Sequence, residues 1–460
     1  MSDYQLIVIG AGPGGYTAAL RAAKLGLHTA IVECREVGGT CLNRGCIPTK
    51  TLLHASQVYY DAVNGAGVGV HGSLSYDIGE MFDFKRSVSE KLRSGIHALL
   101  KGTKVDVIEG TAQIAAPGQV DVTGADGAVT RYTAERILAA TGSVNVRPPI
   151  PGLELPGVMT SDELLEGTDT PYQSIVIIGA GVIGVEFATF YSHLGCQVTL
   201  VEGMANLLPQ LDRELGQNLA QILKKQGVEV LTSAMVQSVE QTAGGLCVHL
   251  EQKGKELTVT GEKVLCAIGR RAYFDGLFAA GLTPALNGKR LLVDESYQTS
   301  IPGVYAIGDA SAAVQLAHVA AAQGVDCVER MCGGRGSIDL NVIPSCIYSA
   351  PEIAAVGLAE AEAREQGIPA VSGKCTLFSN ARTIIEDPGR CFMKLVARTD
   401  THELIGAQLM CQHASDMISQ LSTAMVNRLT VEQLLIVMRP HPSFEEALGE
   451  AVENLASKLA

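Results

Sequence analysis

The 460-residue sequence contains no tryptophan, no long run of basic residues and no apolar run long enough to cross a membrane. Because the formal net charge is −13 and lysine and arginine are not clustered, sequence-independent binding of nucleic acid is not expected. The first residues show no basic stretch followed by an apolar segment, so no signal peptide is expected either. These absences favour a cytoplasmic protein that binds neither membrane nor nucleic acid.

The composition is that of a folded chain with several domains. Apolar residues make up 47% and charged residues 18%, which excludes wholesale disorder. At roughly 150 residues per domain, the length predicts about three domains. The 12 cysteines are scattered, and a chain of this size does not need disulfides for stability, so most of them are expected to be reduced.

A glycine-rich segment occurs twice, as QLIVIGAGPGG at 5–15 and as SIVIIGAGVIG at 174–184. Three glycines recur with an offset of 169 residues: Gly10, Gly12 and Gly15, then Gly179, Gly181 and Gly184. In each copy a helical stretch (16–25 or 185–194) and a second apolar strand follow, and the strands end at Glu33 and Glu202. Each copy is therefore predicted to be a right-handed βαβ unit in a parallel sheet.

A G-x-G-x-x-G sequence between a strand and a helix, with an acid 18 residues further on, is typical of dinucleotide binding. The glycines permit a tight turn and a close backbone approach, and the helix amino terminus offers N–H groups to a pyrophosphate. Either copy alone could also be a βαβ turn without a ligand. Glu202 would repel a 2′-phosphate and 203–209 contain no basic residue, so NAD is favoured over NADP.

Two cysteines lie in the segment GGTCLNRGCIPTK at 38–50. On a regular helix Cys41 and Cys46 would have Cα atoms roughly 8 to 9 Å apart, whereas a disulfide needs less than about 7 Å. Pairing would require a distorted backbone, which Gly45 and Pro48 permit; the alternative is a pair of buried thiols. The same spacing recurs at 327–332 in an undistorted helical stretch, and that pair is expected to be inert.

Together, GGTCLNRGCIPTK and the preceding G-x-G-x-x-G–Glu unit resemble the class I pyridine nucleotide-disulfide oxidoreductases, and the resemblance covers essentially the whole chain. It implies an α/β fold with two Rossmann-like domains, one for FAD and one for NAD, and a C-terminal α+β dimerisation domain. It also implies a redox-active disulfide between Cys41 and Cys46 beside the flavin. The expected domains are 1–147 for FAD, 148–269 for NAD, 270–337 completing the FAD domain, and 338–460 for dimerisation.

The same resemblance assigns further cofactor-binding residues: Thr40, Lys50, Thr141, Gly142 and Asp309 to FAD, and Glu186 and Gly269 to NAD. Lys50 and Glu186 are expected to pair near the flavin and the nicotinamide, where the carboxylate would limit the cost of burying the cation. Asp309 ends the segment TSIPGVYAIGD and is expected to hold the ribityl chain. In isolation it would be a turn residue after a strand.

The segment PHPSFEE at 440–446 resembles the family pattern His-Pro-Thr-x-x-Glu. It implies that His441, oriented by Glu446, shuttles protons to the dithiol of the partner subunit in an obligate homodimer, often with a cis bond before Pro442. Histidine suits this task because it exchanges protons near neutral pH. Four departures from the family concern the substrate more than the reaction class: Ser443 in place of Thr, Thr49 in place of Ser, and the charged residues Arg44 and Arg439.

The resemblance therefore implies an enzyme that passes electrons from dihydrolipoamide through the Cys41–Cys46 disulfide and FAD to NAD. Its partner would be the lipoyl-bearing component of a 2-oxo acid dehydrogenase or of the glycine cleavage system. One alternative is another NAD(P)H-dependent disulfide or metal-ion reductase of the same superfamily; another is a binding protein that keeps the fold without turnover. No metal site is expected, and the other ten cysteines are expected to be inert.

Overall fold

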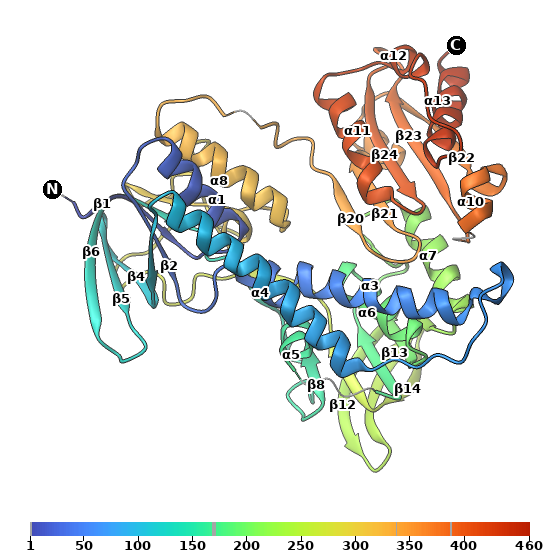
Figure 1. The fold of residues 1–460 in the computed structure, drawn as a ribbon, viewed down its shortest axis with the longest axis horizontal. Helices are drawn as coiled ribbons and strands as arrows, with labels where there is room; N and C mark the ends of the chain where they lie inside the picture. Colours follow the sequence, from blue (N-terminus) through green and yellow to red (C-terminus); the bar gives the residue numbers. More distant parts are fainter. Residues whose placement is uncertain (1, 168–171, 337, 387–388) are drawn as a thin grey trace.

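The computed structural model describes residues 2–167, 172–336, 338–386 and 389–460 (Figure 1). Its amino-terminal sheet has the parallel order β3-β2-β1-β6, and β19, from much later in the chain, pairs with β6. These strands span Tyr4–Ile9 (β1), Thr29–Glu33 (β2), Asp106–Glu109 (β3), Val129–Ala139 (β6) and Val304–Ala306 (β19). The chain thus returns to its first sheet after a long excursion. Strands β4 (Thr111–Ala116) and β5 (Gln119–Thr123) extend this sheet by antiparallel pairing.

Helices α1 (Pro13–Lys24) and α8 (Ala317–Met331) pack against each other beside this sheet (Figure 1). Small residues permit the close approach, because a Cβ atom on Gly324 would lie 2.6 Å from the carbonyl oxygen of Gly14. Two longer helices, α3 (Cys46–Val63) and α4 (Ile78–Gly102), run from this unit towards the second one (Figure 1). Packing of α3 against α6 (Val182–His193) connects the two units.

The second sheet is entirely parallel, in the order β11-β10-β9-β15-β8. Its strands span Val158–Thr160 (β8), Ser174–Ile178 (β9), Gln197–Glu202 (β10), Glu229–Thr232 (β11) and Lys263–Cys266 (β15). An antiparallel layer of β12 (Ala234–Thr242), β13 (Gly245–Gln252) and β14 (Lys255–Gly261) belongs to the same unit. Alternate residues of β13 are buried, so one face of this layer packs on a hydrophobic core.

The carboxy-terminal unit is an antiparallel sheet in the order β20-β21-β24-β23-β22, with helices packed against it (Figure 1). Its strands span Ser345–Ile347 (β20), Ile353–Gly357 (β21), Ala370–Thr376 (β22), Phe392–Arg398 (β23) and Leu404–Met410 (β24). Its principal helices are α11 (Ala414–Val426), α12 (Val431–Leu435) and α13 (Glu445–Leu459). The predicted α/β class, with two parallel nucleotide-fold units and a C-terminal α+β unit, is confirmed.

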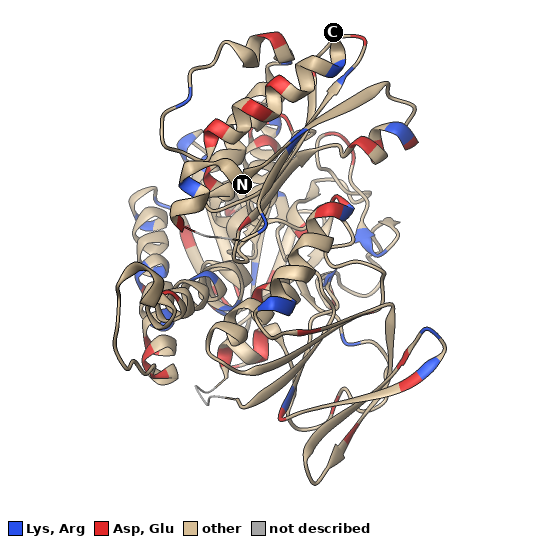
Figure 2. Cartoon of the chain, turned by 90° about the vertical axis from the view of Figure 1, so that its right-hand side faces the viewer, with Lys and Arg blue, Asp and Glu red and all other residues tan. Residues whose placement is uncertain are grey.

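The two predicted helices begin earlier than the sequence pattern indicated. They start at Pro13 and Val182 instead of residues 16 and 185, because the turn after the second glycine of each motif is already helical. No described helix is both long and apolar enough to span a membrane. Figure 2 shows lysine and arginine interspersed with aspartate and glutamate, without one extended basic face in that view.

Candidate functional site

The third glycine of each fingerprint is required by close packing between the strand and the helix. A Cβ atom on Gly15 would lie 1.8 Å from the carbonyl oxygen of Gly10, and Gly184 stands in the same relation to Gly179. The helices α1 and α6 begin directly after Gly12 and Gly181, with no side-chain cap and no acidic residue in the first turn. Their amino-terminal N–H groups are thus available to an anion.

The acids at the ends of the second strands hold the fingerprint loops in place. Glu33 accepts the N–H of Ala11 on one carboxylate oxygen at 2.7 Å and that of Arg35 on the other at 2.9 Å. The second copy repeats this with Glu202, Ala180 and Met204 at 2.7 and 2.8 Å. The 169-residue offset therefore holds for individual hydrogen bonds, and each oxygen retains a lone pair for a ribose hydroxyl.

The geometry of these loops fits two dinucleotides. A Cβ atom on Gly181 would meet nothing within 4 Å, and one on Gly12 would meet only the Cα of Gly39 at 3.9 Å. The open space lies at the amino end of the helix, where a pyrophosphate would accept hydrogen bonds from the backbone. Both loops therefore have the shape and the donors that FAD and NAD require.

Asp309 lies just beyond β19, against the loop that follows β6. Ser143 donates a hydrogen bond to its carboxylate at 2.6 Å, and Arg270 donates to the Ser143 hydroxyl at 2.9 Å. Burial raises the pKa of Asp309 despite these partners. In the neighbouring loops, Thr141 donates a hydrogen bond to the carbonyl of Tyr273, and a Cβ atom on Gly142 or Gly269 would meet nothing within 4 Å.

The two cysteines lie at the junction of two helices. Cys41 is on α2 (Gly39–Arg44) with Thr40 before it, and Cys46 is the first residue of α3. Gly45 breaks the helix between them with φ −145° and ψ −115°, and a Cβ atom there would lie 2.9 Å from the Thr40 carbonyl oxygen. The backbone thus has the distortion that pairing would require. Both cysteines are free, partly buried thiols in this structure.

The environment distinguishes the two thiols electrostatically. A hydrogen bond between the two side chains raises the pKa of Cys41 and lowers that of Cys46 to about 7. Burial acts against ionisation of Cys46, and the positive charge of Lys50 favours it. In the reduced pair the environment therefore favours ionisation of Cys46 over that of Cys41.

Lys50 and Glu186 form an ion pair between α3 and α6. The ammonium lies 2.8 and 2.7 Å from the two oxygens of Glu186, whose residue is only 2% exposed. Burial acts to lower the pKa of Lys50, but the Glu186 carboxylate outweighs it and the pKa is raised. The ring of Tyr348 lies 4.9 Å from the ammonium, and its backbone N–H donates to Glu186 at 3.1 Å. No sequence motif indicated Tyr348, since it comes from the third unit of the chain.

His441 and Glu446 form a separate pair between α12 and α13. Nδ1 of His441 lies 2.7 Å from Glu446 Oε1, and the backbone N–H of Ser443 donates to Oε2 at 3.0 Å. The hydrogen bond from the Ser443 backbone lowers the pKa of Glu446 most, and the hydrogen bond with His441 lowers it further. The His441–Pro442 bond is cis and the imidazole is 73% exposed. Figure 1 shows this part of the third unit well away from the amino end of α3, so one chain does not bring His441 to its own thiols.

The two unusual arginines have structural contacts. Arg44 is buried and forms ion pairs with Glu36 and with Glu166 of α5 (Ser161–Glu166). Arg439 donates to the carbonyls of Val437 and Leu434, and burial lowers its pKa. The guanidinium group of Arg44 thus joins α2 to α5, and that of Arg439 binds backbone carbonyls at the end of α12.

Comparison with known proteins covers nearly the whole chain. Residues 4–324 match the family described as "Pyridine nucleotide-disulphide oxidoreductase", and 343–452 match its dimerisation domain. A dihydrolipoyl dehydrogenase of Bacillus subtilis is 36% identical over 98% of this chain and 97% of that protein. The solved structure of LpdA from Mycobacterium tuberculosis is similar, with a TM-score of 0.88 and 28% identity over 98% of this chain and 99% of that one. RclA of Escherichia coli, an HOCl-induced flavoprotein disulfide reductase, has a TM-score of 0.86 and 28% identity over 99% of both chains.

Proposed function

The chain belongs to the pyridine nucleotide-disulphide oxidoreductase family, with FAD and NAD as cofactors, and from this premise we propose that it oxidises dihydrolipoyl groups with NAD. The observation that carries the proposal is the pair of partly buried thiols at the distorted α2–α3 junction, where the environment favours ionisation of Cys46 over that of Cys41. Lys50 and Glu186, held between two units, lie next to this pair.

In the proposed reaction a dihydrolipoyl thiolate attacks Sγ of Cys41 in the oxidised enzyme. A substrate–Cys41 disulfide forms as the Cys41–Cys46 bond breaks, and Cys46 leaves as a thiolate. The second substrate thiol then attacks the first substrate sulfur, which is bonded to Cys41 in the mixed disulfide. This step closes the lipoyl ring and releases Cys41. The lowered pKa of Cys46 makes it the better leaving group, so attack is directed to Cys41.

Two protons leave the substrate together with two electrons. Cys41 takes up one proton as it is released from the mixed disulfide, and His441 of the partner subunit accepts the other, with its ring oriented by that subunit's Glu446. Bound FAD supplies the path by which both electrons reach NAD, and NADH forms with net release of one proton. Gly10, Gly12, Gly15, Glu33, Thr40, Thr141, Gly142 and Asp309 are proposed to hold FAD; Gly179, Gly181, Gly184, Glu202 and Gly269 are proposed to hold NAD.

The assembly proposed here is a homodimer that serves a lipoyl-bearing component of a 2-oxo acid dehydrogenase or of the glycine cleavage system. The family's dimerisation domain at 343–452 supports the dimer. The scattered cysteines favour a cytoplasmic location. Domain boundaries after residues 147, 269 and 337 are also part of the proposal, and the pairing of β19 with β6 supports the return to the first domain.

The test is NAD-dependent oxidation of dihydrolipoamide by the purified flavoprotein, compared with NADPH-driven reduction of glutathione disulfide. We expect turnover in the first assay and little in the second. Cys46→Ser should abolish dihydrolipoamide oxidation while NADH oxidation by an artificial dye remains, and Cys332→Ser is the matched control. Full dihydrolipoamide activity in Cys46→Ser would refute the role of the disulfide, and preference for glutathione disulfide would refute the substrate.

A further inference from the structure

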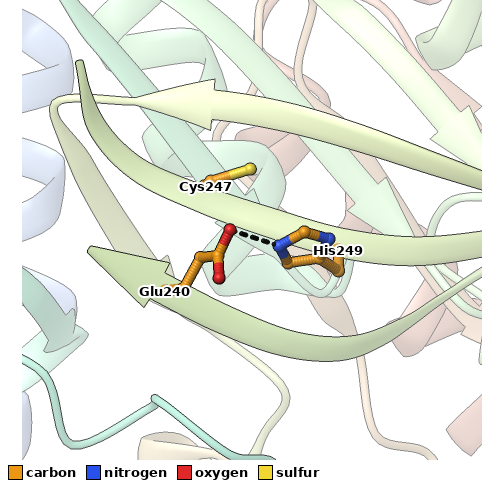
Figure 3. A group of neighbouring side chains, drawn as sticks. All are labelled: Glu240, Cys247 and His249. Atoms are coloured by element: carbon orange, nitrogen blue, oxygen red, sulfur yellow. Dashed lines mark ion pairs between the residues drawn. The ribbon is translucent and has the colours of Figure 1, made fainter. Parts of the chain in front are cut away.

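A group of three possible metal ligands lies outside the proposed redox site, on the antiparallel layer of the second unit. Glu240 is on β12, and Cys247 and His249 are on β13 (Figure 3). Their ligand atoms all lie within 4.8 Å of one another. The spacing of these residues in the sequence did not indicate a metal site. Cys247 and His249 lie close to Glu240 only because β12 and β13 pair.

The strand register places the three side chains on one face. Glu240 is directly opposite Cys247 in the antiparallel pair, and His249 follows two residues later on the same strand. The intervening Val248 and its neighbours Leu246 and Leu250 are buried on the other face, in the hydrophobic core of this unit. The ligand face is therefore fixed by a packed strand and is not carried on a loop.

The imidazole of His249 is held close to the carboxylate in an arrangement that leaves its nitrogen without a hydrogen bond. Nε2 lies 2.9 Å from Glu240 Oε1 (Figure 3). In the described part of the chain no hydrogen bond is assigned to this shielded nitrogen, and its contact with Glu240 is an ion pair. An imidazole nitrogen that lies near a carboxylate and a thiol can donate to a cation, which would take the place of the direct contact with Glu240.

We propose that Glu240, Cys247 and His249 bind one zinc ion or a similar borderline divalent transition metal. Thiolate, imidazole and carboxylate are the ligands that zinc takes, at about 2.0 to 2.3 Å, in tetrahedral sites. Ligands at those distances are separated by roughly 3.3 to 3.8 Å, so the present cluster needs only small side-chain rotations. A water molecule would complete the tetrahedron. Cys247, one of the ten cysteines outside the redox pair, has a role as a metal ligand in this site.

The site is independent of the redox function. Figure 1 shows β12, β13 and β14 on the far side of the second unit from the third unit, and the cluster shares no residue with the dithiol or its ion pair. Binding crosslinks two adjacent strands and displaces the thiol proton of Cys247. Zinc uptake and proton release are therefore two readouts that do not depend on turnover.

The experiment is equilibrium dialysis of the oxidised holoenzyme, freed of metal with a chelator, against buffered Zn²⁺. We expect one zinc per chain. Cys247→Ser, His249→Gln and Glu240→Gln should each weaken binding at least as much as the roughly 10- to 100-fold loss that follows removal of an outer-shell partner. Each variant is checked for unchanged flavin content. Because three separate ligands are tested, misfolding of a single variant cannot account for the result.

The matched controls are Glu251→Gln, which removes a carboxylate two residues beyond His249, and Cys332→Ser, which removes an exposed thiol elsewhere in the chain. Both should bind zinc as the parent does, as should Cys41→Ser/Cys46→Ser. Calorimetry in buffers of different ionisation enthalpy should show proton release that is lost in Cys247→Ser. Equal affinity in all three ligand variants, or complete loss of zinc in the Cys41→Ser/Cys46→Ser enzyme, would overturn the proposal.

Discussion

The ionisation of Cys46 can be tested directly. Its pKa is lowered from an ordinary value of 9.0 to about 7, because Cys41 donates a hydrogen bond to the thiolate. A thiol whose pKa is lowered in the folded protein contributes stability that is complete above pH 9 and is lost as the pH falls through 7. Thiolate absorbance of the reduced holoenzyme should therefore titrate with a midpoint near 7. A midpoint at 9 or above would contradict the assignment of Cys46 as the thiolate.

The two members of the Lys50–Glu186 pair act on Cys46 with opposite sign. Lys50 lowers its pKa and Glu186 raises it. Lys50→Met should therefore move the thiolate midpoint above 7, and Glu186→Gln should move it below 7, in the same absorbance titration. Shifts of the same sign in both variants would indicate a general loss of structure and not an electrostatic effect.

The same variants should differ in stability. Lys50→Met leaves a carboxylate without its cation at a residue that is 2% exposed, whereas the side chain of Lys50 is 29% exposed. Removing one partner of a buried pair costs about 3 kcal/mol at the lower end of the observed range. Lys50→Met should therefore lower the Tm of the holoenzyme more than Glu186→Gln does.

At the scale of elements, the junction of α2 and α3 determines how the cysteines meet. A Cβ atom on Gly45 would lie 2.9 Å from the carbonyl oxygen of Thr40, so Gly45→Ala must displace one helix relative to the other. We expect lower dihydrolipoamide turnover and a changed Cys46 midpoint.

A matched control exists in α4, where a Cβ atom on Gly95 would meet nothing within 4 Å. Gly95→Ala should leave turnover unchanged and stabilise the helix by roughly 0.5 to 1 kcal/mol, measured by thermal unfolding. Normal turnover and an unchanged midpoint in Gly45→Ala would show that the junction tolerates a side chain.

The repeated βαβ units could be predicted because the residues that determine them lie close together in the sequence. The glycines, the helix and the closing acid follow one another within 30 residues, and the backbone contacts of Glu33 and Glu202 are identical in the two copies. The contacts of Tyr348 with Lys50 and Glu186 could not be predicted, because they join three units far apart in sequence. The Glu240–Cys247 pairing was missed for a similar reason, since strand register depends on the packed core beneath it.

At the scale of the whole molecule, the thiols and the proposed proton acceptor occupy different units, and one chain does not bring them together (Figure 1). We propose that His441 of the partner subunit completes the site, as the resemblance to the family implies. Two inactive variants can test that arrangement, because each damages a different half of the site. Cys46→Ser removes the leaving thiolate, and His441→Ala removes the proton acceptor while leaving the cysteines intact.

A mixed dimer of these two variants should regain activity. In that dimer the intact cysteines of the His441→Ala chain face the intact His441 of the partner subunit, so one of the two sites is complete. Co-expressed and purified heterodimers should therefore show about half of the parent dihydrolipoamide turnover per dimer, whereas both homodimers remain almost inactive. If His441 served the cysteines of its own chain, neither site of the heterodimer would be complete and no activity would return.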